Sequence, residues 1–95
     1  MDEEQRIKEA LEAVQQHSKS WKRFKNLTYE LTEDSTGDES LDCWVLLDNE
    51  TTDDEITSQE TQIIKNEIRE NLFQRKVTRF PYVYFARESE YVPEL

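Results

Sequence analysis

The stretch LDCWVLLD, residues 41–48, is the most apolar run of the chain, and it decides which fold the remaining residues can adopt. In an extended strand, successive side chains point to opposite faces. One face then carries Leu41, Cys43, Val45 and Leu47, and the other carries Asp42, Trp44, Leu46 and Asp48. Because both faces are apolar at their centre, we predict a central strand that is covered on each side.

A second strand and a turn precede this stretch. Residues 27–32 alternate between apolar and polar side chains, which predicts a half-buried strand with one wet face. Residues 34–40 are polar and contain the only glycine of the chain, Gly37, which predicts a hairpin turn. We therefore expect residues 27–48 to form a β-hairpin.

Two amphipathic helices flank the hairpin in the sequence. The first is predicted from Asp2 to about His17, because Ile7, Leu11 and Val14 recur at helical spacing. The second is predicted to begin between residues 53 and 58 and to end near residues 75–76.

The capping-box spacing of Thr57 and Glu60 favours the later start of the second helix. Its apolar stripe consists of Ile64, Ile68 and Leu72, with Ile63 and Phe73 as candidate additions. This pattern predicts a helix with one face against a sheet.

A third strand is predicted over residues 80–87, which are rich in aromatic and β-branched side chains, with Pro81 at its start or on an edge. The expected fold is therefore α+β, a single domain spanning residues 1–95 in the order α-β-β-α-β. We expect a three-stranded, mostly antiparallel sheet with both helices packed on one face. Residues 88–95 form a candidate flexible tail.

Negative charge is concentrated around the central strand. Residues 30–60 contain twelve carboxylates and no Lys or Arg, whereas the formal charge of the whole chain is −10. This balance disfavours binding to nucleic acid or to an anionic membrane, and it favours a cationic partner or solubility alone. A short basic cluster around Arg23 is predicted to be a connector that can pair with the acidic stretch or with a second copy of the chain.

Residues that could carry catalysis are few. His17 is the only histidine and lies on a polar part of the first predicted helix, where we expect it to be solvated. Cys43 lies in the apolar strand, where burial disfavours a reactive thiolate. The sequence has no Gly-rich phosphate loop, nucleophile elbow or zinc-ligand spacing. We therefore predict that the protein is not an enzyme and that it needs no cofactor.

One acidic loop has part of the spacing of a calcium loop. Asp48, Glu50 and Thr52 would occupy the first, third and fifth positions, but Asp53 stands where glycine is needed and Gln59 where a bidentate glutamate is needed. The loop that begins at residue 34 departs from the pattern in the same way, so no metal site is predicted. The sequence shows no signal peptide and no apolar run of membrane-spanning length, so we expect a cytoplasmic location.

The second face of the sheet is the best candidate for function. If the helices cover the face that carries Leu31 and Val45, the opposite face carries Trp44 and Leu46. The third strand would add either Tyr82 with Tyr84 or Val83 with Phe85. The candidate partner-binding set is therefore Trp44, Leu46, Tyr82 and Tyr84, with an acidic rim of Glu30, Asp42 and Asp48. Alternatively, the C-terminal tail or a second subunit covers this face.

Three hypotheses for function follow from these features. The first is a small, acidic, non-enzymatic interaction protein that binds a cationic protein partner, such as an inhibitor, an antitoxin-like or immunity-like factor, or an accessory subunit. The second is a nucleic-acid mimic whose carboxylates imitate phosphates and block a DNA- or RNA-binding protein. The third is a small hydrolase.

Overall fold

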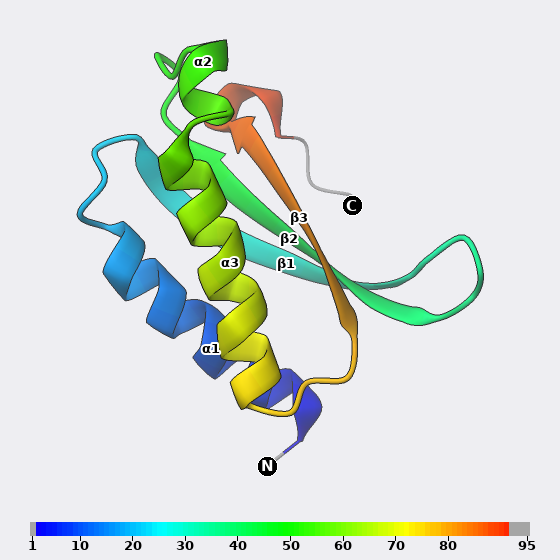
Figure 1. Ribbon diagram of the computed structural model, residues 1–95. Coiled ribbons are helices and arrows are strands. Elements are labelled where there is room, and N and C mark those ends of the chain that lie inside the picture. The colour runs from blue at the N-terminus through cyan, green and yellow to red at the C-terminus, as the bar shows by residue number, and fades with distance from the viewer. Residues whose placement is uncertain (1, 92–95) are drawn as a thin grey trace.

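The apolar stretch is the central strand, β2 (Glu39–Leu47), of a three-stranded sheet in the computed structural model, which describes residues 2–91 (Figure 1). The strand β1 (Phe24–Glu33) pairs antiparallel with β2, and β3 (Phe80–Arg87) pairs parallel with β2 on its other side. The predicted α+β class and element order are confirmed. The sheet is mixed, because β3 returns to it through a helix, and a crossover of that kind places two strands in parallel.

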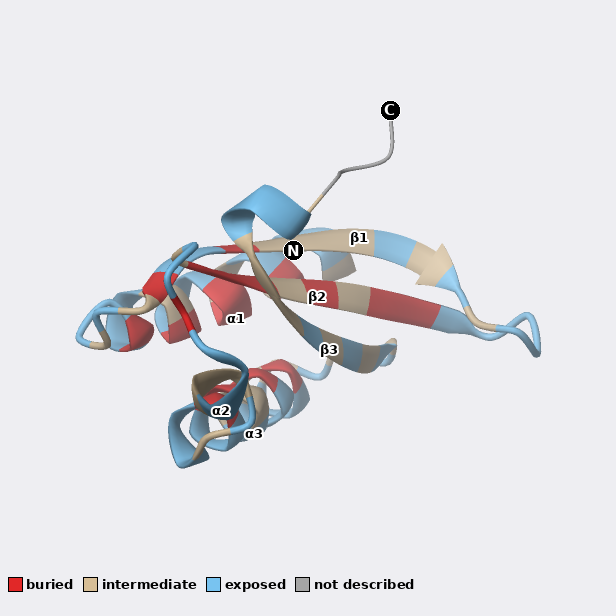
Figure 2. Cartoon of the chain, turned by 90° about the horizontal axis from the view of Figure 1, so that it is seen from above, coloured by how far each residue is buried: buried red, intermediate tan, exposed pale blue. Residues whose placement is uncertain are grey.

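Two long helices, α1 (Glu3–Ser18) and α3 (Gln59–Gln74), lie on one side of the sheet (Figure 2). A short helix, α2 (Asp53–Ile56), leads into α3. The core between helices and sheet contains Ile7, Ala10, Leu11, Val14, Phe24, Leu27, Leu41, Cys43, Val45, Leu47, Ile64, Ile68 and Leu72. Burying a large aliphatic side chain contributes about 1.5–3 kcal/mol, so this layer dominates the stability of the fold.

The hairpin turn forms where it was predicted. Gly37 has a φ of 84°, a conformation that glycine adopts without strain. The Asp34 carboxylate accepts hydrogen bonds from the Thr36 and Asp38 backbone N–H groups at 2.9 and 3.1 Å. A hydrogen bond from the Thr36 hydroxyl at 2.6 Å is the main cause that lowers the pKa of Asp34, and the backbone bonds lower it further. The carboxylate thereby organises the turn.

The capping prediction at Thr57 and Glu60 is wrong. The capping box lies one turn earlier: the Glu55 N–H donates to Thr52 Oγ1 at 3.2 Å, and the Thr52 N–H donates to Glu55 Oε1 at 3.0 Å. Three acidic residues in the first turn of α2 further favour a helix start there. The helical conformation is therefore interrupted at Thr57, and α3 begins after Ser58. The Ser58 side chain makes no capping hydrogen bond.

The apolar stripe of α3 is narrower than predicted. Ile64, Ile68 and Leu72 are buried, whereas Ile63 and Phe73 are 48% and 83% exposed. The helix periodicity explains the difference, because residues next to the buried positions in sequence point about 100° away from them.

A left-handed residue closes the C-terminal end of α3. Lys76 has a φ of 59°, its N–H donates to the Phe73 carbonyl, and the Val77 N–H donates to the Leu72 carbonyl. This arrangement is a Schellman motif, in which glycine is the usual residue at the left-handed position.

The chain turns back after β3. The 3₁₀ helix η1 (Glu88–Glu90) follows Arg87 directly, and the Ser89 N–H donates to Asn49 Oδ1 at 2.9 Å. The last four residues of the candidate flexible tail, 92–95, lie outside the described residues. Over residues 2–91, no helix has the length and apolarity needed to cross a membrane.

Candidate protein-binding face of the sheet

The face of the sheet opposite the helices, here called the open face, is defined by the strand register. Trp44 of β2 lies beside Thr28 of β1 and Tyr84 of β3, and Asp42 lies beside Glu30 and Tyr82. The alternative set, Val83 and Phe85, packs against the core on the helix side. The register therefore assigns the two tyrosines to the open face.

Aromatic rings run across the open face in two contacting groups. The rings of Trp44 and Tyr84 stack with 4.7 Å between centroids, and Tyr91 lies against Trp44 at 5.3 Å. Phe80 and Tyr82 form a tilted pair at 4.8 Å. Phe80, Tyr82 and Tyr84 are 53%, 36% and 40% exposed, whereas Trp44 is half-buried. The exposed part of the face is thus formed mainly by β3.

The C-terminal segment covers one end of this face. Figure 2 shows η1 on the side of the sheet opposite the long helices. Tyr91, which follows η1, contacts Trp44. Leu46 is only 8% exposed and is not part of the helix-side core. The chain's own tail therefore covers the Trp44 end in part and leaves the Tyr82 end open.

Two carboxylates face each other on the open face without a cation between them. Glu30 and Asp42 are cross-strand partners, and neither makes an ion pair with any residue in the range 2–91. Like charges directly opposite each other on a sheet are destabilising. Partial burial also raises the pKa of Asp42, because desolvation disfavours its charged form.

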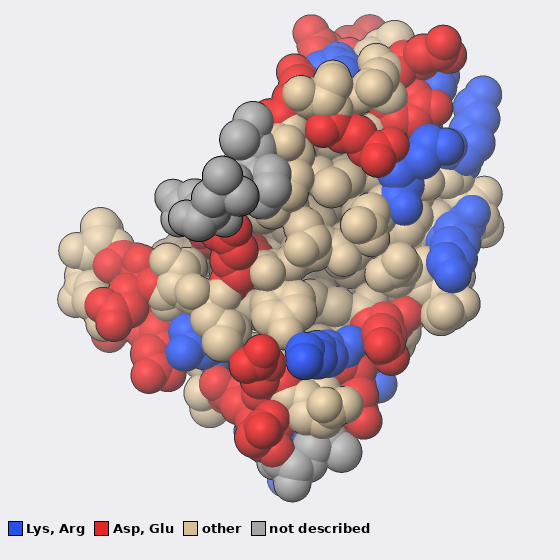
Figure 3. Space-filling model, turned by 180° about the vertical axis from the view of Figure 1, so that it is seen from behind, with Lys and Arg blue, Asp and Glu red and all other residues tan. Residues whose placement is uncertain are grey.

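A shallow hollow of about 310 Å³ lies at the hairpin end of the open face. Its lining includes Thr32, Asp34, Ser40, Asp42, Tyr82 and Tyr84. Ser40 is 1% exposed, and its hydroxyl has no hydrogen-bond partner in the described part of the chain. Seen from behind, acidic side chains gather over the hairpin end and over the end that carries α2, with uncharged residues between them (Figure 3).

Asp48 lies away from this hollow, at the end of β2. Its carboxylate pairs with Arg23 at 3.4 Å, and Arg23 also pairs with Glu55 at 2.9 Å. The predicted pairing between the basic cluster and the acidic stretch is confirmed for Arg23. The two contacts link the connector after α1 to the end of β2 and to α2.

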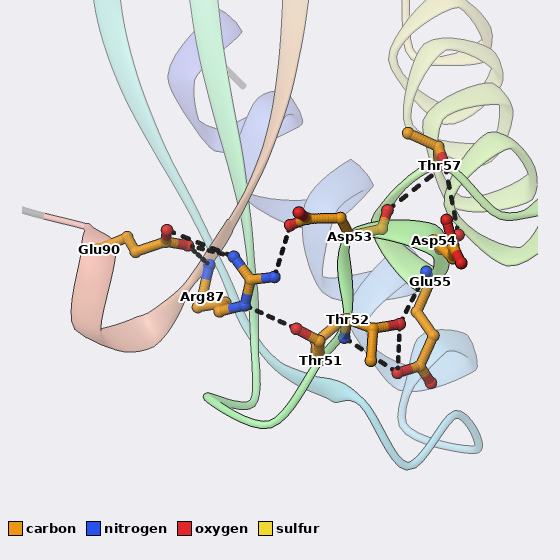
Figure 4. Close-up of polar contacts among 8 residues, drawn as sticks. All are labelled: Thr51, Thr52, Asp53, Asp54, Glu55, Thr57, Arg87 and Glu90. Atoms are coloured by element: carbon orange, nitrogen blue, oxygen red, sulfur yellow. Dashed lines mark hydrogen bonds and ion pairs between the residues drawn. The ribbon is translucent and has the colours of Figure 1, made fainter.

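Two further arginines neutralise other acidic residues. Arg87 donates to the Thr51 carbonyl at 2.6 Å and pairs with Asp53 at 2.8 Å and Glu90 at 3.1 Å (Figure 4). Arg79 pairs with Glu3 and Glu39, each at 3.6 Å. Together, the three arginines engage four of the twelve carboxylates of residues 30–60, namely Glu39, Asp48, Asp53 and Glu55. One third of the carboxylates in the acidic stretch therefore form ion pairs within the chain.

The single cysteine and the single histidine of the chain both lie away from the open face. Cys43 is fully buried in the core, and burial raises the pKa of its thiol to about 12. His17 is exposed on α1, where its Nδ1 lies 2.8 Å from a Glu67 oxygen of α3. No group of three His, Cys, Asp or Glu residues that could hold a metal ion is found within residues 2–91.

Three contributors to this face were not in the sequence-predicted set: Phe80, Ser40 and Tyr91. Phe80 is spaced by two residues from Tyr82 and by four from Tyr84, so its side chain belongs to the same face of β3. The alternation of side chains within β3 could therefore have identified it. Ser40 likewise precedes Asp42 by two residues. Tyr91 could not have been placed, because its position depends on the turn made by η1.

Comparison with models of known protein families, with curated proteins and with solved structures gives no match for this chain. Its function therefore has to be inferred from its own geometry.

Proposed function

We propose that the protein is a small, acidic, non-enzymatic interaction protein that binds a basic protein partner through the open face of its sheet. The observation that supports this most is the row of exposed aromatic rings on β3 beside Asp42, a carboxylate with no cationic partner among the described residues. Aromatic anchors with polar surroundings are typical of protein interfaces. An inhibitor, an antitoxin-like or immunity-like factor and an accessory subunit would all use such a surface in the same way.

The nucleic-acid mimic has less support than ordinary protein binding. A mimic needs a regular track of free carboxylates, and four of the twelve in the acidic stretch are held by arginines of the same chain. The exposed aromatic rings of β3 also favour a partner with an apolar contact surface. Direct binding to nucleic acid is disfavoured by the net charge of −10.

Photo-crosslinking in cells tests the proposal. A photoreactive phenylalanine analogue is placed at Tyr82 on the open face and, as a matched control, at Phe73, which is exposed on α3. We expect the Tyr82 position to crosslink to one basic protein, and the Phe73 position not to. If the Tyr82 position gives no specific product, or if both positions give the same product, the open face is not the binding surface.

The partner identified in this way is then purified and titrated calorimetrically. Tyr82→Ala is expected to weaken binding roughly thirtyfold, because truncating an aromatic anchor typically costs about 2 kcal/mol. Ile63→Ala, on the exposed side of α3, is the control and should leave the affinity unchanged. Equal affinities for wild type and Tyr82→Ala would contradict the proposal.

A gel-shift titration at low salt separates this proposal from nucleic-acid binding. Electrostatic binding to DNA or RNA is strongest at low ionic strength. We expect no shift at micromolar protein, and a shift would indicate that the basic residues around Arg23 dominate the electrostatics.

A further inference from the structure

We propose that the hollow at the hairpin end of the open face receives an arginine side chain of the protein partner. This inference rests on the proposed function and specifies the chemistry of the contact. The hollow is lined by groups that accept hydrogen bonds and by two phenol rings: Asp34, Asp42, Ser40, Thr32, Tyr82 and Tyr84.

Asp42 supplies the negative charge that would attract an arginine side chain. It is half-buried between neighbouring strands, and desolvation alone raises the pKa of its carboxyl group. Its cross-strand neighbour Glu30 is also a carboxylate. Arg79, which immediately precedes β3, is engaged by Glu3 and Glu39 and donates to the carbonyls of Thr32 and Ser40. A cation from outside would therefore neutralise a charge that the described residues leave uncompensated.

Ser40 supplies an independent observation that points to a ligand. Its hydroxyl is buried and unpartnered, although its residue lines the hollow. A buried polar group that lacks a hydrogen bond destabilises the fold. A donor placed in the hollow would give the Ser40 oxygen its missing partner.

The remaining groups favour a guanidinium over an ammonium ion. A guanidinium presents five N–H donors in one plane, whereas an ammonium is a compact point charge. The acceptors of the hollow come from two strands: Thr32 from β1, and Ser40 and Asp42 from β2. The rings of Tyr82 and Tyr84 offer faces on which a planar cation can stack. Several hydrogen-bond acceptors beside aromatic rings match the planar guanidinium of arginine.

Peptide titration followed by ¹H–¹⁵N NMR tests the assignment without knowledge of the partner. The probes are acetyl-Gly-Arg-Gly-amide, the citrulline analogue, which has the same shape without the charge, and the lysine analogue. We expect the arginine peptide to shift the amide signals of Ser40, Asp42 and Tyr82, with weaker shifts for lysine and none for citrulline. Equal shifts for arginine and citrulline, equal binding of arginine and lysine, or shifts elsewhere would overturn the assignment.

Matched variants locate the site. Asp42→Asn is expected to weaken binding of the arginine peptide about tenfold, which corresponds to 1.4 kcal/mol. Asp54→Asn removes the same formal charge from the exposed helix α2 and should leave binding unchanged. The amide spectrum of each free variant verifies that it is folded. If Asp42→Asn does not fold, Ser40→Ala is the second substitution within the hollow. Equal weakening by Asp42→Asn and Asp54→Asn would show a general charge effect and would overturn the site.

The failure of this inference is distinguishable from the failure of the proposed function. If the arginine peptide does not bind while Tyr82→Ala still weakens the cellular partner, the open face is the interface and the hollow is not an arginine site. If neither Tyr82→Ala nor crosslinking at Tyr82 has an effect, the proposed function itself is wrong.

Discussion

The indole ring of Trp44 contacts two phenol rings, Tyr84 of the neighbouring strand at 4.7 Å and Tyr91 of the C-terminal segment at 5.3 Å. Tyr91 thereby fastens η1 onto the sheet.

Removing the Tyr91 ring should expose Trp44 without unfolding the domain. Aromatic pairs contribute about 0.5–1.5 kcal/mol beyond their buried area, so Tyr91→Ser should lower the free energy of unfolding by at least that amount. In a Trp21→Phe background, Trp44 is the only tryptophan, and its emission should shift to longer wavelength with stronger acrylamide quenching. Unchanged emission would show that Tyr91 does not cover Trp44 in solution.

Cys43 should react slowly with thiol reagents in the native state. Its side chain is fully buried, and burial raises the pKa of the thiol to about 12, so at pH 8 the nucleophilic thiolate is scarce. Ellman's reagent should label the native protein slowly and the urea-unfolded protein rapidly. Equal rates in the two states would contradict the burial and would reopen a role for a reactive cysteine.

Glu55 should make the fold sensitive to acid. Hydrogen bonds from the Thr52 backbone and from Arg23 lower the pKa of Glu55 to about 2, from an ordinary value of 4.5. A pKa that is lower in the folded state stabilises the fold above the ordinary value, and that contribution is lost as the pH falls from about 4.5 to about 2. Glu55→Gln should therefore reduce stability at pH 7 and flatten its decline between pH 5 and pH 2.

The measurement for Glu55 is urea unfolding followed by circular dichroism across that pH range. Glu12→Gln, at an exposed position of α1, changes the charge equally and serves as the control. If Glu55→Gln and Glu12→Gln show the same pH dependence, the hydrogen bonds to Glu55 do not persist in solution.

Lys76→Gly should stabilise the protein. Lys76 holds a left-handed conformation, φ 59°, that costs a non-glycine residue about 1–2 kcal/mol and costs glycine little. We expect the free energy of unfolding to rise by about 1 kcal/mol. Lys76→Ala removes the same charge without relieving the backbone and should bring no such gain. A gain with alanine equal to that with glycine would assign the effect to charge instead.

Patterns that act within one element were sufficient to predict most of the fold. The alternation of residues 41–47 identified the central strand and its buried face, and the spacing of Ile64, Ile68 and Leu72 identified the helix stripe that packs against it. The bounds of β3 also match the prediction. These features depend on burial periodicity, which is a local property of sequence.

Two kinds of feature were not predictable from the sequence: the choice between competing capping boxes, and features that depend on contacts between residues distant in sequence. Two capping boxes were available to the second helical region, and the one at Thr52 and Glu55 formed, partly because Arg23, which is distant in sequence, pairs with Glu55. Alternation within a strand could not decide whether Tyr82 or Val83 faces the helices, because both strand faces are apolar. The register with β2 decided it.

The parallel pairing of β3 with β2 has a consequence for the order of folding. The β1–β2 hairpin closes over a short turn, whereas β3 reaches β2 only after residues 48–79 have been traversed. Non-local pairing is slower than local pairing, so the hairpin can form while one edge of β2 still lacks its neighbour. During synthesis on the ribosome, β2 is completed before α3 and β3 emerge. A nascent chain paused there would present an unpaired strand edge, and chaperone binding or aggregation would be concentrated at that stage.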